Sequence, residues 1–228
     1  MPPAPPYRPP PDEGLRILAL DARWIAVDKP AELLTVPGRG EHLHDCLLSR
    51  VQRRHPEARL VHRLDQPTSG IVILARDAQA QRRLSHAFET RQADKRYVAV
   101  VHGLVQHEAG EIDLPLACDW PNRPRHVVDR VCGRPARTRY RVLSRDAGAQ
   151  TTRLELQPLT GRTHQLRVHL QALGHPIVGD RLYATEHERR RAPPSPRLLL
   201  HAARLVLPQV DDGAGETALI TLCCDPPF

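Results

Sequence analysis

The sequence predicts an α+β fold. Short apolar stretches that alternate or are rich in β-branched residues, as strands are, outnumber the amphipathic stretches that are typical of helices. The two kinds of stretch do not follow one another regularly, which favours α+β over a doubly wound parallel sheet. No unit of about 20 to 50 residues repeats along the chain, so nothing indicates a solenoid or a propeller.

Composition and length limit the class of protein. The 228 residues can bury one good core or two small ones, and 40% hydrophobic with 26% charged residues is a globular composition. No apolar run approaches the roughly 18 residues of a membrane helix, and the first residues lack the features of a secretory signal. Five cysteines without a C-x-x-C pair indicate neither a disulfide framework nor a zinc site. We therefore expect a reduced, cytoplasmic protein.

The N-terminal half predicts a tail followed by a hairpin, helices and strands. Residues 1–13 hold seven of the 23 prolines, so we expect a disordered or polyproline II tail and a folded domain over 14–228. Two apolar stretches flank Asp21 and Ala22, as in a hairpin. Further elements are expected in this order: a turn-rich loop over 31–40, a short helix near 45–54, a strand over 71–74, a helix within 78–92 and a strand over 95–103.

The second of these helices has a cap and an apolar face. Asp77 is placed to accept hydrogen bonds from its first N–H groups. Four residues then recur at helical spacing on one face: Leu84, Ala87, Phe88 and Arg91.

The C-terminal half predicts an irregular excursion, then strands around one helix. Residues 110–133 are rich in Pro, Arg and His and are expected to form a long irregular segment, and strands are expected over 136–143, 151–159, 197–207 and 216–224. Between the second and third of these strands we expect a helix that starts at Thr163, presents Leu166, Leu170 and Leu173 on one face, and ends at Gly174 before Pro176.

Two polar clusters are candidate sites. The segment 62–70, HRLDQPTSG, concentrates polar groups immediately before a buried strand, as catalytic loops do. A plain turn in which Asp65 caps the backbone or pairs with Arg63 explains the same residues. In the second cluster, Arg162 lies at a helix entrance, where backbone N–H groups favour an anion, although a surface arginine is an equal alternative.

Motifs of other enzyme classes are absent. The chain has no Walker-type loop, no G-x-G-x-x-G, no H-E-x-x-H and no G-x-S-x-G. We therefore expect neither a nucleotide cofactor nor a metal. The formal net charge of +7 indicates a polyanionic partner such as nucleic acid. Only Lys29 and Lys95 are lysines, a bias that G/C-rich codons explain without reference to function.

Four segments resemble the successive motifs of the RluA family of pseudouridine synthases: HRLDQPTSG at 62–70, KRYVAVVHG at 95–103, GRTHQLRVHLQALGHPIVGD at 161–180 and RLLLHA at 197–202. The resemblance implies a mixed, largely antiparallel sheet with flanking helices, in a single catalytic domain without the S4 RNA-binding domain that many members carry. It also implies an isomerase that converts specific uridines of RNA into pseudouridine by base flipping and without a cofactor. AELLTVPGR and CDWPNRP further resemble members that act on the anticodon stem-loop of tRNA and on a hairpin of 23S rRNA.

The resemblance also assigns residues. Asp65 matches the catalytic aspartate, Arg162 the arginine that keeps it ionised, and Tyr97 the tyrosine that packs on the target base. Further substrate and RNA contacts are expected from His62, Arg63, Leu166, Asn122, Arg123 and Arg125, with His126 beside them. We expect a monomer that binds RNA and no membrane. A non-catalytic RNA-binding module and a metal-dependent hydrolase acting on RNA are the alternatives.

Overall fold

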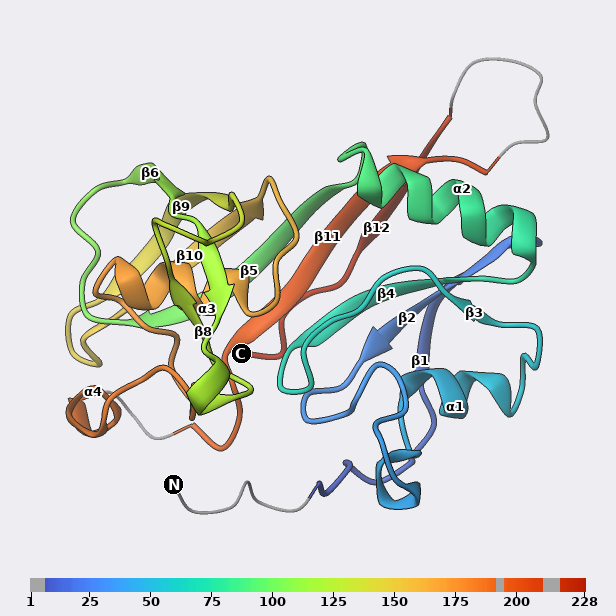
Figure 1. Cartoon of the computed structure of the whole chain (residues 1–228), viewed down its shortest axis with the longest axis horizontal. Coiled ribbons are helices and arrows are strands. Elements are labelled where there is room, and N and C mark those ends of the chain that lie inside the picture. Colours follow the sequence, from blue (N-terminus) through green and yellow to red (C-terminus); the bar gives the residue numbers. More distant parts are fainter. Residues whose placement is uncertain (1–6, 192–194, 211–217) are drawn as a thin grey trace. The chain divides into compact units, whose positions relative to one another are not determined.

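The structure is a computed structural model that describes residues 7–191, 195–210 and 218–228. The chain forms two compact units, Met1–Ala93 with Val206–Cys224 and Asp94–Leu205 with Asp225–Phe228. Strand β11 (Leu200–Pro208) begins in the second unit and ends in the first. Figure 1 labels the elements. In the described part of the chain, no helix has the length and apolar character that crossing a bilayer requires.

The first unit is built on an antiparallel hairpin and a buried strand. β1 (Arg16–Leu20) pairs with β2 (Trp24–Lys29), β2 pairs with β4 (Ser69–Ala75), and the short β3 (Arg59–Leu60) pairs with the end of β4. The side chains of β4 are buried along its whole length. The remaining elements of this unit are the 3₁₀ helix η1 (Glu41–Leu43), α1 (Leu47–Gln52), α2 (Ala78–Glu89) and β12 (Leu219–Cys223). The predicted hairpin, short helix and apolar strand are confirmed.

Helix α2 begins where its cap predicts. The Asp77 carboxylate accepts hydrogen bonds from the N–H groups of Gln79 and Ala80, both at 2.8 Å. Leu84 and Ala87 are buried as predicted, whereas Arg91 lies beyond the last turn, with a positive φ of 63°.

Part of the predicted tail contacts the folded part of the chain. Residues 1–6 lie outside the described residues, but residues 7–13 contact helix α1 and the residues that flank it through hydrogen bonds and ion pairs. They form no helix or strand of their own. The partners that hold them to the rest of the chain lie 27 or more positions further along, so no local pattern in the sequence reveals the contact.

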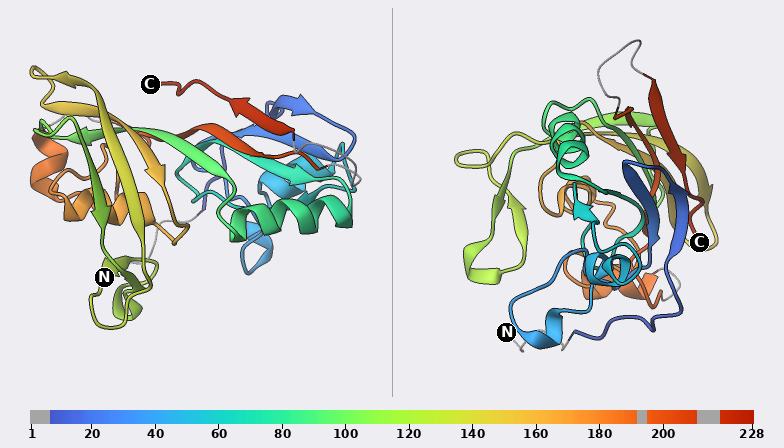
Figure 2. Two further views of the ribbon diagram at one scale, coloured as in Figure 1. Left: turned by 90° about the horizontal axis from the view of Figure 1, so that it is seen from above. Right: turned by 90° about the vertical axis from the view of Figure 1, so that its right-hand side faces the viewer.

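The second unit is an antiparallel sheet with one helix packed on a face. Its strands run in the order β5 (Asp94–His102), β10 (Thr151–Pro158), β9 (Arg137–Asp146) and β6 (Ala109–Asp113). Leu166 and Leu170 of helix α3 (Gln165–Ala172) pack with Ala99, Leu154 and Leu156 of the strands in one core cluster, on the face where Figure 2 shows the helix. The α+β class, with its largely antiparallel sheet and flanking helices, is confirmed.

The excursion over 110–133 is more regular than expected. Its first residues belong to β6, which pairs with β9. Next comes a hairpin of β7 (Leu116–Cys118) and β8 (His126–Val128), whose connection contains the 3₁₀ helix η2 (Trp120–Asn122). The strands are only three residues long, and the connection between them is rich in turn formers, which hides their periodicity.

The start of α3 also differs from the prediction. The helix begins at Gln165 rather than Thr163, and its N-cap is His164, in the left-handed region at φ 55° and without a capping side chain. Its end is as predicted: Gly174 has a φ of 85°, a conformation that glycine adopts without strain. The short helix α4 (Glu186–Arg191) follows later in this unit.

A buried ion pair fixes α3 to the turn that follows it. Arg167 donates to both carboxylate oxygens of Asp180, at 2.7 and 2.8 Å, and both side chains are almost completely buried. Asp180 also accepts hydrogen bonds from the N–H groups of Leu182 and Tyr183. Removing one member of such a pair leaves an uncompensated buried charge.

We expect Asp180→Ala to lower the free energy of unfolding by about 3–5 kcal/mol, because it strands the Arg167 guanidinium. Chemical denaturation measures this loss. The matched control is Glu186→Ala, which breaks the exposed pair between Glu186 and Arg190 on α4 and should cost under about 1 kcal/mol. Equal costs for the two variants would contradict this interpretation.

Candidate active site

Asp65 lies in the loop between β3 and β4, in the first unit. The loop, here called the aspartate loop, covers residues 61–68. Asp65 is partly buried, and its carbonyl oxygen accepts the Thr68 N–H at 3.1 Å, which closes a turn around Gln66 and Pro67. The fully buried strand β4 follows at once, so the aspartate is held next to a rigid element.

A buried lysine joins the aspartate loop to the loop after β2. The Lys29 side chain is fully buried, and its ammonium group donates to the carbonyl oxygens of Pro30 at 2.9 Å, Leu33 at 2.6 Å and Gln66 at 3.0 Å. A buried ammonium is stable only where its N–H groups find acceptors. Lys29 therefore fixes Gln66, the neighbour of Asp65, to residues 30–33.

A threonine makes a second link between the same loops. The Thr35 hydroxyl donates to the Leu64 carbonyl at 2.7 Å and accepts the Leu64 N–H at 3.2 Å, and both residues are buried. The backbone on each side of Asp65 is thus attached to the loop over 30–36. The lysine and the threonine were not identified from the sequence. Lys29 was visible there only as one of two lysines in an arginine-rich chain.

His62 and Arg63 differ in their surroundings. The His62 Nε2 accepts the Ile73 N–H at 3.1 Å, so the proton of the neutral ring resides on Nδ1, and the ring stacks on Phe88 with centroids 4.4 Å apart. His62 thus anchors the aspartate loop to β4 and α2. Arg63 is exposed. That these two side chains contact RNA stays a prediction.

Tyr97, Leu166 and Arg162 belong to the second unit. Tyr97 lies on β5 opposite Leu156 and packs, partly buried, against the core cluster that contains Leu166. Arg162 lies in the turn before α3 and donates from Nε to the Pro135 carbonyl at 3.1 Å. Burial lowers the pKa of Lys95, which lies two residues before Tyr97 on β5.

A buried glutamine organises the turn that carries Arg162. The Gln165 amide oxygen accepts the Thr160 hydroxyl at 2.8 Å and the Arg162 N–H at 3.0 Å, and its amide nitrogen donates to the Arg137 carbonyl and the Thr138 hydroxyl. These four hydrogen bonds use both ends of the amide. Gln165 was also missed from the sequence, where it is one polar residue in a polar cluster.

His164, the residue before Gln165, contacts Tyr183. Its Nδ1 lies 2.7 Å from the Tyr183 hydroxyl, which accepts the His126 N–H at 2.8 Å. Burial raises the pKa of Tyr183 to about 12, so the hydroxyl stays protonated at neutral pH. These contacts tie the start of α3 to the β7–β8 hairpin within the second unit.

The basic residues of the hairpin have unequal surroundings. The Arg123 guanidinium stacks over Trp120 at 3.5 Å from the ring centroid, and both side chains are exposed. Arg125 instead donates to the Leu182 carbonyl and lies over the Tyr183 ring, and Asn122 donates to the Asp119 carboxylate. Arg123 is therefore more available to a partner than Arg125.

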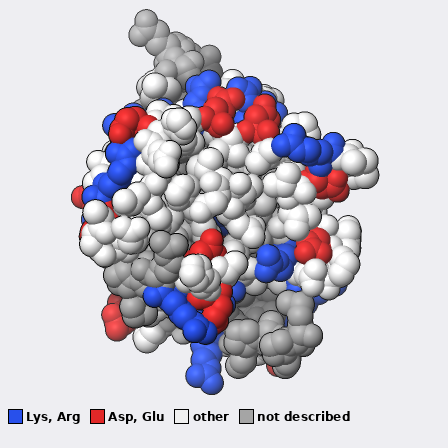
Figure 3. Space-filling view, turned by 90° about the vertical axis from the view of Figure 1, so that its left-hand side faces the viewer, with Lys and Arg blue, Asp and Glu red and all other residues white. Residues whose placement is uncertain are grey.

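Several surface arginines lie beside carboxylates. On the face in Figure 3, Lys and Arg side chains lie beside Asp and Glu side chains rather than in one continuous basic patch. Arg137 and Arg139 both pair with Glu111, and Arg141 pairs with Glu155. Hydrogen bonds from Arg139 and Arg137 hold the pKa of Glu111 below its ordinary value.

The fold resembles solved RNA pseudouridylate synthase domains. The human RNA pseudouridylate synthase domain containing 1 aligns with a TM-score of 0.78 and 29% identity, covering 97% of this chain and 87% of that one. The human RNA pseudouridylate synthase domain containing 4 aligns with a TM-score of 0.72 and 28% identity, over 93% and 88%. The fold is thus that of a pseudouridylate synthase.

Sequence comparison identifies the family. Residues 23–172, which extend into both units, match the model of the RNA pseudouridylate synthase family. The dual-specificity RNA pseudouridine synthase RluA of Escherichia coli (strain K12) is 48% identical over 88% of this chain and 90% of its own length. The protein of the same name from Vibrio parahaemolyticus is 48% identical over 87% of this chain and 80% of its own length. The chain belongs to the RNA pseudouridylate synthase family and is an isomerase that acts on uridine in RNA. The predicted family and enzyme class are confirmed.

We expect Thr35→Val to loosen the aspartate loop, because the buried Leu64 N–H and carbonyl lose their partner. The free energy of unfolding should fall by about 1–3 kcal/mol, and amide exchange at Leu64 and Thr68 should become faster. Thr35→Ser keeps the hydroxyl and is the matched control, with exchange rates at these two amides close to those of the unchanged protein. Slow exchange at both amides in the valine variant would rule out this link.

Proposed function

We propose that this enzyme forms pseudouridine in two RNA classes in the cytoplasm, in the anticodon stem-loop of tRNA and in a hairpin of 23S rRNA. Two observations support the proposal. The relatives from E. coli and V. parahaemolyticus carry the name dual-specificity RNA pseudouridine synthase, and 48% identity extends over most of their length. The segments AELLTVPGR and CDWPNRP resemble those of members with both substrates.

Asp65 is the proposed catalytic residue. The observation that carries this assignment is a partly buried carboxylate on a loop whose backbone is held on both sides, at Leu64 by Thr35 and at Gln66 by Lys29. The reaction breaks the N1–C1′ bond of the uridine, turns the uracil and joins C5 to C1′, and the C5 proton then leaves to N1. The ionised carboxylate acts at C1′, at C6 or on a ribose proton. A rigid loop holds it at the reacting atoms.

Residues of the second unit receive the supporting roles. By resemblance to the family motifs, Arg162 is assigned to support the catalytic carboxylate. The Tyr97 ring packs on the uracil and allows it to turn, and Leu166 supplies an apolar wall. The target nucleotide leaves its stack, which costs little in a loop, and Arg63 occupies the space it leaves. His62 stays a proposed contact beside it, on the loop that it anchors.

The tip of the β7–β8 hairpin is the proposed contact with the RNA backbone. Arg123 and Trp120 are exposed there and stacked on each other, so a cation and an aromatic face are presented together. That combination suits unpaired nucleotides, whose phosphates and bases are both accessible. Asn122 and Arg125 contribute by holding the tip in shape, with Arg125 bound to the Leu182 carbonyl.

Asp65→Asn should abolish pseudouridine formation in both the tRNA stem-loop and the rRNA hairpin, because the amide is neither a nucleophile nor a base at neutral pH. Tritium release from C5-labelled uridine measures turnover, and filter binding should show an RNA Kd within several-fold of the original. Asp77→Asn, which keeps a capping side chain on α2, is the matched control and should stay active. Turnover by the Asp65 variant would remove that residue from the mechanism, and no turnover of the rRNA hairpin by the unchanged enzyme would exclude dual specificity.

Arg123→Ala should flatten the salt dependence of RNA binding. Loss of one phosphate contact changes the slope of log K against log salt concentration by about 0.7 for single-stranded RNA. Arg123→Lys preserves the charge and should keep the original slope, although it loses the flat contact with Trp120. If alanine and lysine give the same slope as arginine, the phosphate contacts lie elsewhere.

A further inference from the structure

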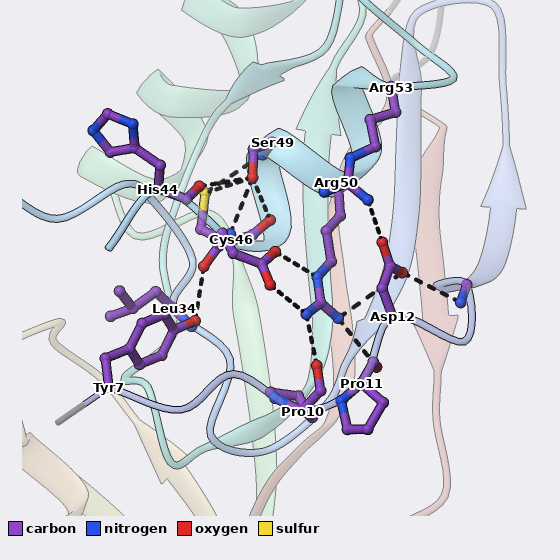
Figure 4. Close-up of polar contacts among 12 residues, drawn as sticks. Tyr7, Pro10, Pro11, Asp12, Leu34, His44, Cys46, Ser49, Arg50 and Arg53 are labelled. Atoms are coloured by element: carbon purple, nitrogen blue, oxygen red, sulfur yellow. Dashed lines mark hydrogen bonds and ion pairs between the residues drawn. The ribbon is translucent and has the colours of Figure 1, made fainter. Parts of the chain in front are cut away.

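Residues 7–13, here called the N-terminal strap, are attached to helix α1 and to the segment before it (Figure 4). The Tyr7 hydroxyl donates to the Asp45 carbonyl at 2.8 Å. Arg50 of α1 donates to the carbonyl oxygens of Pro10 at 2.6 Å and Pro11 at 3.4 Å. Asp12 forms ion pairs with Arg50 and Arg53. Proline has no N–H group and offers only its carbonyl, which is the group that these contacts use.

Arg50 is the buried side chain that binds the strap. Only 6% of the residue is exposed, and its Nε and Nη2 both bind the Asp45 carboxylate at 2.7 Å. Those hydrogen bonds lower the pKa of Asp45, so the pair stays ionised. The guanidinium charge is thereby balanced without the strap, and its remaining N–H groups are directed at the Pro10 and Pro11 carbonyls.

The Tyr7 hydroxyl links two segments that lie far apart in the sequence. It accepts the Leu34 N–H at 3.1 Å while it donates to the Asp45 carbonyl. Partial burial raises the pKa of Tyr7, so the hydroxyl keeps the proton it donates. Leu34 is also held from the other side, since its carbonyl accepts the Leu47 N–H at the start of α1, at 2.8 Å.

From Leu34 the contacts lead directly to the aspartate loop. The neighbouring Thr35 binds both backbone groups of Leu64 through its hydroxyl, and Leu64 precedes Asp65. On the other side, the Leu33 carbonyl shares the Lys29 ammonium with Gln66, which follows Asp65. Residues 33–35 therefore lie between Tyr7 and the backbone on both sides of the aspartate.

We propose that the N-terminal strap positions Asp65 for the isomerisation, and that the Tyr7 hydroxyl, acting through residues 33–35, is its point of action. Tyr7 is a positioning residue rather than a catalytic one. The proposal rests on the role of Asp65 proposed above.

The first test is Tyr7→Phe, which keeps the ring and removes the hydroxyl. We expect kcat to fall about tenfold, since small displacements of a catalytic group have large kinetic effects, while KM stays within about twofold. Amide exchange at Leu34 and Leu64 should become faster. The matched control is Tyr140→Phe on β9, which should leave kcat and both exchange rates unchanged.

The second test separates positioning from stability. A chain that begins at Gly14 should lose kcat as the Tyr7 variant does, whereas one that begins at Tyr7 should retain it. A synthetic peptide of residues 1–13, added in trans, should restore kcat to the shorter chain, and the same peptide with Tyr7→Phe should not. All rates are taken with saturating RNA, at a temperature where the unfolding curve of each variant shows it fully folded.

These outcomes decide the proposal independently of the assignment of Asp65. A normal kcat in Tyr7→Phe or in the chain from Gly14, with Asp65→Asn inactive, would overturn the positioning role and leave the proposed function intact. A lower unfolding midpoint with unchanged kcat would likewise assign the strap to stability alone. Turnover by Asp65→Asn would instead overturn the proposed function, whatever the strap does.

Discussion

The first unit depends on one buried ammonium group. Lys29 ends β2 with its charge wholly buried, and three backbone carbonyls replace the water that it has lost. Because one carbonyl comes from the aspartate loop and two from the loop after β2, neither loop can move without breaking a bond to a buried charge. Thr35 repeats the link, and α1 and the N-terminal strap then pack against loops that are already joined.

In the second unit, a neutral amide and a buried ion pair hold the loops and the helix in place. The Gln165 amide holds the turn that carries Arg162, and the pair of Arg167 and Asp180 holds the helix that follows. Asp65 in the first unit and Arg162 in the second both lie in a loop or turn, and the residues that fix these segments are buried and polar. Such buried polar groups stabilise one arrangement strongly, since any alternative leaves donors or acceptors without partners.

Sequence predicts the elements whose signals are local. The β1–β2 hairpin, the Asp77 cap and the Gly174 end of α3 follow from periodicity and from single-residue preferences. Asp65, Tyr97 and Arg162 were found because motifs mark them, and their roles stay proposals. Contacts between distant residues have no such signal. In the sequence, Tyr7 and Pro10 belong to a proline-rich tail, and only the structure shows that Pro10 binds Arg50 and Tyr7 binds Asp45. His164 adopts a left-handed conformation that only its tertiary contacts explain, so Thr163 was wrongly expected to begin the helix.

The pairing of the β9 arginines with glutamates has a consequence for turnover. Substrate and product of an isomerase have the same atoms and the same phosphates, so attraction to the backbone holds both equally well. A surface of unpaired arginines would slow the departure of finished RNA as much as it sped the arrival of new RNA. Because Glu111 and Glu155 form ion pairs with the β9 arginines, those arginines add little to the nonspecific attraction of RNA phosphates. The net charge of +7 therefore overstates how strongly this part of the surface attracts RNA, whether substrate or product.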